Sequence, residues 1–148
     1  MEQELNISNS EMVVMRVVWS LGEAKVEDVM HQVSKRQDWS LATVKTLMGR
    51  LVKKEILTTV KNGRAFTYYP ALSECGAVRQ MTSDLLGKVC ATKQNQIVSD
   101  MIEMSELTEA DISKLIAQLQ KKKVVEKVMC SCLDDDSCHC MHNQVELA

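Results

Sequence analysis

A two-residue signal near the middle of the chain, Asn62-Gly63, most constrains the fold. It separates two runs rich in β-branched and aromatic residues, 58–61 and 64–69. Asn-Gly between such runs is the strongest short-range sequence signal for a β-hairpin. Phe66 and Tyr68 alternate onto one face of the second run, so we expect both to pack against the core. Three segments with helical periodicity precede the hairpin, and this order predicts a winged helix-turn-helix domain.

Capping residues and apolar stripes delimit the three helices. Ser8 and Glu11 form an S-x-x-E capping box, and Gly22 stands where helices commonly end. A second amphipathic helix is expected over roughly 25–36, and Ser40 is expected to cap a third helix. The expected buried stripe of the third helix is Val44, Leu47, Met48 and Leu51.

The face of the third helix opposite this stripe is small, hydroxylated and basic. Its members are Ala42, Thr43, Thr46, Gly49, Arg50 and Lys53, flanked by Lys45 and Lys54. Threonine can hydrogen-bond a base edge or touch a thymine methyl group, and arginine can read guanine or hold a phosphate. We therefore expect a recognition helix in which Thr43, Thr46 and Arg50 read bases. The residues assigned to the phosphate backbone are Lys45, Lys53, Lys54 and Arg64, with Lys61 and Asn62 beside them at the hairpin tip.

Charge is distributed unevenly along the 148 residues. The formal net charge is −2, but the segment 35–64 carries eight Lys or Arg residues against two acids, a net charge of +6. From Cys130 onward there are four acids and no Lys or Arg. A local basic patch on a mildly acidic protein is the footprint expected for nucleic-acid binding, although a solvated basic face is the alternative.

The pattern changes after Pro70. Three more amphipathic helices are expected, one from near Ser73, one around 97–102 and one opened by a capping pair at Thr108 and Asp111. Few other elements of the chain are available to bury the apolar stripes of these helices. We therefore expect this region to pack against a second copy and form a homodimer. The predicted domains are a winged helix-turn-helix at 1–72, a helical dimerisation region at 73–128 and a metal-binding tail at 129–148. We expect the isolated Cys75 and Cys90 to be buried as small apolar residues.

The composition, like the apolar patterns, favours a mainly α-helical chain, because only 3% of the residues are aromatic and there is one proline. Apolar residues make up 45% of the chain, which is enough to bury a core. No apolar run approaches the 18 residues of a membrane span, and Met1 to Asn6 do not form a secretory signal. We therefore expect a cytoplasmic protein that does not enter the membrane. No catalytic constellation is visible, so an enzyme is not expected.

Four of the six cysteines lie within eleven positions, as two Cys-x-Cys pairs separated by five residues. The expected metal ligands are Cys130, Cys132, Cys138 and Cys140. Thiolates are soft ligands that suit Zn²⁺ and Cu(I), and the tight spacing favours Cu(I). Two disulfides are the alternative, but they are rare in a reducing cytosol. His139 and His142 are expected to be tail residues rather than further ligands.

Four segments resemble one known family. They are Met15 to Trp19, Trp39 to Leu47, Arg50 to Lys54 and Gly63 to Tyr68, and they are similar to the BlaI/MecI penicillinase-repressor family. The paired Cys-x-Cys tail resembles the copper-responsive branch of that family. Two positions depart from the pattern: five residues rather than four separate the cysteine pairs, and Glu55 stands where members often have glycine.

The resemblance implies a homodimeric repressor on an inverted repeat with TACA/TGTA arms, upstream of copper-export genes. It also implies that the four tail cysteines hold Zn²⁺ in the DNA-bound form and bind Cu(I), the inducer, on release. A copper chaperone that donates Cu(I) is a further partner to be expected. The alternatives are a β-lactam-responsive repressor inactivated by proteolysis, a copper-storage or chaperone protein, and a thiol-redox enzyme, the last disfavoured because Cys-x-x-Cys is absent.

Overall fold

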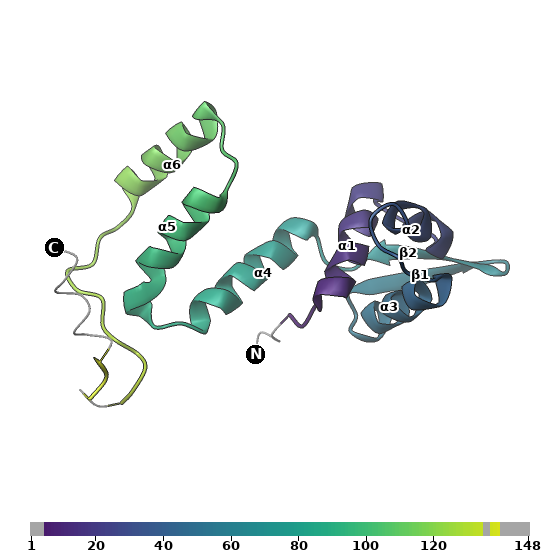
Figure 1. Ribbon diagram of the computed structural model, residues 1–148, viewed down its shortest axis with the longest axis horizontal. Coiled ribbons are helices and arrows are strands. Elements are labelled where there is room, and N and C mark those ends of the chain that lie inside the picture. The colour runs from purple at the N-terminus through teal and green to yellow at the C-terminus, as the bar shows by residue number, and fades with distance from the viewer. Residues whose placement is uncertain (1–4, 135–136, 140–148) are drawn as a thin grey trace. The chain divides into compact units, whose positions relative to one another are not determined.

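The computed structural model describes residues 5–134 and 137–139 (Figure 1). The chain divides into two compact units, Met1–Asp84 and Leu85–Ala148. The elements in order are α1 (Asn9–Leu21), α2 (Val26–Val33), α3 (Leu41–Lys53), β1 (Leu57–Asn62), β2 (Ala65–Pro70), α4 (Glu74–Gly87), the short 3₁₀ helix η1 (Ala91–Lys93), α5 (Gln94–Met104) and α6 (Glu109–Lys121). The predicted winged helix-turn-helix and the mainly helical remainder are thereby confirmed.

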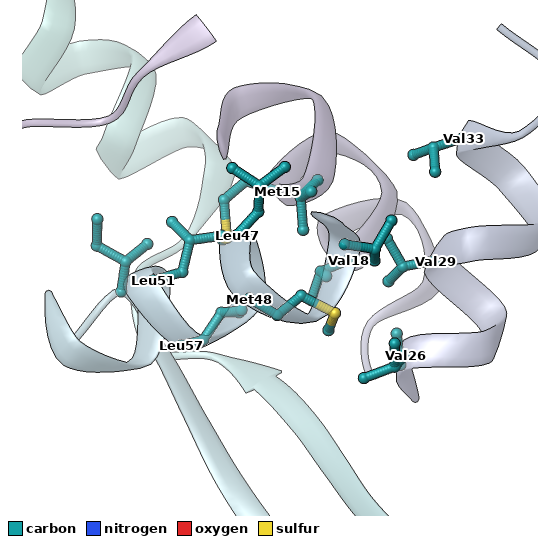
Figure 2. Close-up of a cluster of buried hydrophobic side chains, with 13 residues drawn as sticks. Met15, Val18, Val26, Val29, Val33, Leu47, Met48, Leu51 and Leu57 are labelled. Carbon is teal, nitrogen blue, oxygen red and sulfur yellow. The ribbon is translucent and has the colours of Figure 1, made fainter. Parts of the chain in front are cut away.

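The first unit packs three helices and the hairpin around one apolar core (Figure 2). The labelled side chains of that core are Met15 and Val18 from α1, Val26, Val29 and Val33 from α2, Leu47, Met48 and Leu51 from α3, and Leu57 from β1. Each such buried side chain contributes about 1.5–3 kcal/mol through removal of apolar surface from water. The predicted stripe of α3 is buried throughout, so the opposite face of that helix is left outside the core.

Capping residues delimit α1, and the length of its apolar stripe sets the end of α2. Ser8 and Glu11 form the predicted capping box, with the Glu11 N–H donating to Ser8 Oγ at 3.2 Å and the Ser8 N–H to Glu11 Oε2 at 3.0 Å. Gly22 ends α1 at φ 83°, a left-handed value that glycine adopts without strain. Helix α2 ends at Val33 rather than near residue 36, because its apolar stripe ends there.

The end of α3 is a Schellman motif, in which the next two backbone N–H groups turn back onto the last helical carbonyls. The Ile56 N–H donates to Leu51 O at 2.9 Å, and the Glu55 N–H donates to Val52 O at 3.0 Å. Glu55 occupies the left-handed position at φ 62°, the only non-glycine residue with positive φ among those described. This left-handed position favours glycine, and this chain places a strained glutamate there.

The hairpin is confirmed, but its turn lies one residue later than Asn-Gly predicts. Asn62 pairs with Ala65, so the two-residue loop is Gly63-Arg64. Gly63 has φ 65° and Arg64 does not have a positive φ, which excludes a type I′ turn and agrees with the glycine-first type II′ turn. The wing is extended by backbone hydrogen bonds between Ala24 and Tyr68 in both directions, at 2.8 and 3.0 Å.

Two aromatic predictions have different outcomes. Tyr68 packs against the core as expected. Phe66 is 46% exposed instead, and the ammonium of Lys61, its cross-strand partner, lies 5.9 Å from the Phe66 ring centroid. The prediction of a packed Phe66 is wrong because the hairpin projects beyond the helices there, so alternation along a strand does not guarantee a surface to pack on.

Helix α4 crosses the division between the two units. Its Ala77 is fully buried, and the Trp19 indole N–H donates to Leu72 O at 2.8 Å just before the helix begins. These contacts belong to the first compact unit, which ends at Asp84.

The second unit has almost no core of its own. Helices α5 and α6 contain no residue classed as buried in the part of the chain that the structure describes. Their exposed apolar side chains are Val98, Met101, Ile102, Met104, Ile112, Ile116 and Leu119. Within the described residues, no helix has the length and apolar character needed to cross a bilayer.

Candidate nucleic-acid interface and thiolate site

The outward face of α3 carries the predicted base-reading residues. Thr43, Thr46 and Arg50 are exposed, as are Lys45 and Lys53. They are presented to the outside because the buried stripe turns the opposite side of the helix toward the core. The predicted members of this face are therefore brought together on one helix, and the first turn has no acid to oppose an approaching phosphate.

The two threonine hydroxyls are already engaged with their own helix. The Thr46 hydroxyl donates to the Ala42 carbonyl at 2.9 Å, and Thr43 Oγ1 lies 3.0 Å from Ser40 Oγ. A hydroxyl that donates to the backbone keeps its acceptor lone pairs and its neighbouring methyl group for an outside partner. Thr46 is thus suited to accept a hydrogen bond or to contact a methyl group.

Lys54 has a structural partner that the sequence does not reveal. Its ammonium donates to Glu11 Oε2 at 2.7 Å and to the Asn6 carbonyl at 2.8 Å. Burial alone would raise the pKa of the Glu11 carboxyl, but hydrogen bonds from Lys54 and Ser8 outweigh burial and hold that pKa below its usual value. Lys54 therefore ties α3 to the start of α1. A contact with phosphate would compete with this ion pair.

The wing tip presents the remaining predicted DNA contacts. Lys61, Asn62 and Arg64 are all exposed. Arg64 sits in the two-residue turn, where its side chain is free of a neighbouring strand. The hairpin thus supplies a second basic projection from the same unit that carries α3.

A cluster of sulfur atoms lies in the second unit. The ligand atoms of Cys90, Cys130 and Cys132 all lie within 4.8 Å of one another, and the Cys90 and Cys130 sulfurs are 3.5 Å apart. Cys90 is 8% exposed and follows the end of α4, whereas Cys130 and Cys132 belong to the segment after α6. The structure therefore adds to the two tail cysteines a third one that sequence analysis assigned to core packing.

The surroundings of Cys90 favour its thiolate, which is the form that binds metals and reacts with electrophiles. The Thr92 hydroxyl, 3.1 Å from Cys90 Sγ, is the largest influence, followed by the backbone N–H groups of Ser131 and Thr92. Together they lower the pKa of the Cys90 thiol to about 5. For Cys130, the Cys132 N–H lowers the pKa, but the neighbouring thiols of Cys138 and Cys90 and burial outweigh it, so the net direction is upward.

The other cysteine predictions can now be placed. Cys75 is exposed on α4, so its predicted burial is wrong. Cys138 is half-buried and hydrogen-bonds with Cys130, but it is not one of the three residues grouped within 4.8 Å. Cys140 and His142 lie outside the described residues, and His139 is exposed. No sequence signal joined Cys90 to the tail, because forty positions separate it from Cys130 and it has no neighbouring ligand residue.

Comparison with known proteins supplies the family. The penicillinase repressor family matches residues 7–121, which is most of the chain but stops before the tail cysteines. The chain is 38% identical over 141 residues to an uncharacterized 16.5 kDa protein in the ptsI 3′ region of Latilactobacillus sakei, covering 94% of this chain and 96% of that protein. It is 30% identical over 117 residues to the penicillinase repressor of Bacillus licheniformis, covering 79% and 91% respectively.

Solved structures of two repressors are similar in sequence to about half of this chain. The DNA-binding domain of the repressor BlaI in solution is 36% identical, covers 50% of this chain and 90% of that chain, and has a TM-score of 0.45. The repressor CopR is 61% identical, covers 45% of this chain and 96% of that chain, and has a TM-score of 0.39. The named relatives are repressors rather than enzymes. The chain therefore belongs to the penicillinase repressor family, the BlaI/MecI family of transcriptional repressors with a winged-helix DNA-binding domain.

Proposed function

We propose that this repressor senses copper, and that it resembles the copper-transport repressor CopY in binding a TACA/TGTA-type inverted repeat upstream of copper-export genes. The single observation that carries the proposal is the grouping of Cys130 and Cys132 with a third sulfur within 4.8 Å. The family match ends at residue 121, so Cys130 and Cys132 lie beyond it, whereas Cys90 lies within it. A repressor that responds only to β-lactams has no use for such a cluster.

The sulfur spacing fits a soft metal ion. Two sulfurs bound to one tetrahedral ion at about 2.3 Å lie about 3.8 Å apart. The observed separation of 3.5 Å between Cys90 and Cys130, and the limit of 4.8 Å for the whole group, bracket that distance. We assign Cys130, Cys132, Cys138 and Cys140 as the residues that hold Zn²⁺ in the DNA-bound form and Cu(I) in the released form. The metal would link these thiolates more strongly than the hydrogen bonds that now join Cys130 to Cys90 and Cys138.

The DNA-binding end of the proposal rests on α3 and the wing. We assign Thr43, Thr46 and Arg50 to base edges in the major groove, with Lys45, Lys53, Lys61 and Arg64 on phosphates. Lys54 belongs to the same set, and a phosphate contact there would compete with its ion pair to Glu11. A second copy of the chain would cover the exposed apolar faces of α5 and α6 and would set the spacing of two half-sites. A copper chaperone that donates Cu(I) stays a prediction.

The energy needed for such a switch is small. Coupling between two sites is typically about 1–3 kcal/mol, whereas structural Zn²⁺ in small peptides contributes on the order of 10–16 kcal/mol. A modest difference between the two metal-bound forms of the tail is therefore sufficient to weaken operator binding.

The test is a gel shift with purified protein on a duplex with TACA/TGTA arms, first with Zn²⁺ and then with Cu(I). We expect a retarded band with Zn²⁺ that is lost as Cu(I) is added. A variant with all four tail cysteines changed to serine should still bind the duplex and should no longer respond to Cu(I). Cys75→Ser is the matched control, since Cys75 is exposed and lies outside the sulfur cluster.

Two results would contradict the proposal. One is a duplex that remains bound at saturating Cu(I), and the other is normal release by the four-serine variant. Release that instead requires proteolytic cleavage of the chain would favour the β-lactam-responsive alternative. The observation in favour of that alternative is the 30% identity to a penicillinase repressor. Failure to bind any inverted repeat at moderate salt would favour a copper-storage protein.

A further inference from the structure

Cys90 is the only cysteine outside the tail segment that reaches the sulfur cluster among the residues described. It stands three residues after the end of α4 and immediately before η1, and it is 8% exposed. Its sulfur lies 3.5 Å from that of Cys130, although forty positions separate them in sequence. The segment after α6 must therefore return to the α4–η1 junction for this contact to form.

Polar groups around Cys90 are arranged as they are around metal-binding thiolates. Thr92 Oγ1 lies 3.1 Å from its sulfur, and the backbone N–H groups of Thr92 and Ser131 also donate to it. Hydrogen bonds to ligand sulfurs orient them and stabilise their charge in metal sites. A cysteine that merely fills space in an apolar core would be surrounded by carbon atoms instead. One of the donors, Ser131, lies between the two cysteines of the first Cys-x-Cys pair.

Cys90 is the described residue whose sulfur groups with both members of the first Cys-x-Cys pair. Zn²⁺ in structural sites takes four ligands, and Cu(I) selects soft sulfur ligands. Cys130 and Cys132 supply two sulfurs, and Cys90 brings a third within 4.8 Å of both. We propose that Cys90 is a ligand of the ion held by Cys130 and Cys132, so that the metal site includes the α4–η1 junction as well as the tail. This inference rests on the proposed function.

Such a ligand would connect the tail to the helical part of the chain. Without it, the bound ion constrains only the segment after α6. With Cys90 included, the same ion closes the loop between the α4–η1 junction and the tail, so a change in metal occupancy or in ligand number acts at the end of α4. Helix α4 begins four residues after β2, the second strand of the wing. Cys90 would therefore give the metal a direct physical link to α4.

The first test uses the unchanged full-length protein, reduced and freed of metal, with Co²⁺ as a spectroscopic substitute for Zn²⁺ and with Zn²⁺ itself. Sulfur-to-cobalt charge-transfer absorption increases with the number of thiolate ligands. We expect Cys90→Ser to lose part of this absorption and to bind Zn²⁺ at least about tenfold more weakly, because even loss of a supporting hydrogen bond commonly costs 10–100-fold in affinity. Cys75→Ser should keep both values. Equal absorption and affinity in Cys90→Ser and the unchanged protein would overturn the inference.

The second test needs no substitution. Alkylation of the unchanged protein, followed by peptide mass spectrometry, gives the rate for each cysteine with and without Zn²⁺. We expect Zn²⁺ to slow alkylation at Cys90 together with Cys130 and Cys132, and to leave Cys75 unaffected. Slowing at the tail cysteines with no change at Cys90 would overturn the inference while leaving the proposed function intact. Absence of charge transfer and of any protection in the unchanged protein would overturn both.

Discussion

At the scale of single residues, Lys54, a predicted DNA contact, also has a structural role through its ion pair with Glu11. Glu11 is 2% exposed and closes the capping box of α1, while its Oε2 also accepts from Lys54 Nζ at 2.7 Å. The Lys54 side chain is 33% exposed, so the pair is only partly shielded from water. Losing one member of a buried pair is costly because the other charge is left without a partner.

We predict that Glu11→Gln lowers the free energy of unfolding by about 1–3 kcal/mol at pH 7, a range reduced from that of fully buried pairs because Lys54 is accessible to water. The pKa of Glu11 is lowered from 4.5 in the folded chain. The Glu11 carboxylate therefore makes its full contribution to the free energy of unfolding above about pH 4.5. That contribution is lost as the pH falls through the lower pKa that Glu11 has in the folded chain. The difference between the two proteins in urea midpoint should accordingly shrink below pH 4.5.

The control for this prediction is Glu27→Gln on α2, where the carboxyl is exposed. That change should alter the urea midpoint little at either pH. A stability difference for Glu11→Gln that stayed constant from pH 7 down to acid pH would show that the carboxylate charge is not what stabilises the α1–α3 contact.

Substitutions of Thr46 can separate the contribution of its hydroxyl to base recognition from that of its methyl group. Because its hydroxyl donates to Ala42 O at 2.9 Å, we expect its methyl group to provide most of the discrimination. Thr46→Val should keep the preference for the operator over a base-substituted duplex, whereas Thr46→Ser and Thr46→Ala should lose about 1 kcal/mol or more of it. Competition binding on the two duplexes measures this, and equal loss in the Val and Ser variants would contradict the assignment.

Lys53 provides the contrasting case at the end of α3. A phosphate contact carries no sequence information, so Lys53→Ala should weaken binding to both duplexes alike. It should also reduce the slope of log K against log salt by about 1. If a dimer neutralises about six phosphates, the slope of the unchanged protein lies near −5.

At the scale of elements, the end of α3 combines good hydrogen bonding with an unfavourable residue. The two Schellman hydrogen bonds satisfy the last carbonyls of α3, and the buried Leu51 and Ile56 accompany them. The motif requires a left-handed residue, and Glu55 adopts φ 62° to provide it. For residues other than glycine this conformation costs roughly 1–2 kcal/mol.

We predict that Glu55→Gly raises the free energy of unfolding by about 1 kcal/mol, because glycine removes the strain and loses some of that gain through its greater freedom in the unfolded chain. Thermal and urea unfolding measure the change. Glu55→Ala is the matched control: it removes the charge but keeps the side-chain strain, so it should give no such gain. A gain of the same size in both variants would mean that charge, and not backbone conformation, is responsible.

At the scale of the whole molecule, the two units differ in how they are stabilised. The first unit buries the side chains of three helices and a strand around one core. The second unit leaves Ile112, Ile116 and Leu119 of α6 between 47% and 60% exposed. Contiguous exposed apolar surface of this kind marks interaction sites in soluble proteins.

We predict that Ile116→Glu weakens self-association of the chain, because it places a charge in the proposed contact between two copies. Sedimentation velocity over a range of concentrations should show a shift toward the monomer, and affinity for a two-arm operator should fall more than affinity for a single half-site. Gln118→Glu is the control on the same helix, since residue 118 lies off the apolar stripe. Unchanged sedimentation of Ile116→Glu would exclude α6 from the interface.

Local features of this chain could be predicted because each depends on neighbours in sequence. The capping boxes at Ser8 and Thr108, the start of α3 after Ser40 and the buried stripe of that helix agree with the structure. The hairpin was predicted from Asn62-Gly63, but its turn moved by one residue. A glycine can begin a tight turn as readily as end one, and only strand pairing decides between the two registers.

The sequence by itself determined the winged helix-turn-helix, the exposed basic face of α3 and the presence of soft ligands near the C-terminus, because periodicity, capping and residue chemistry are local properties. Only the tertiary structure decided that Lys54 pairs with Glu11, that Cys75 is exposed and that Cys90 lies 3.5 Å from Cys130. The two contacts join residues forty or more positions apart, and the exposure of Cys75 depends on which elements cover α4. Such contacts follow from how elements pack together, and composition and spacing within one element carry no information about them.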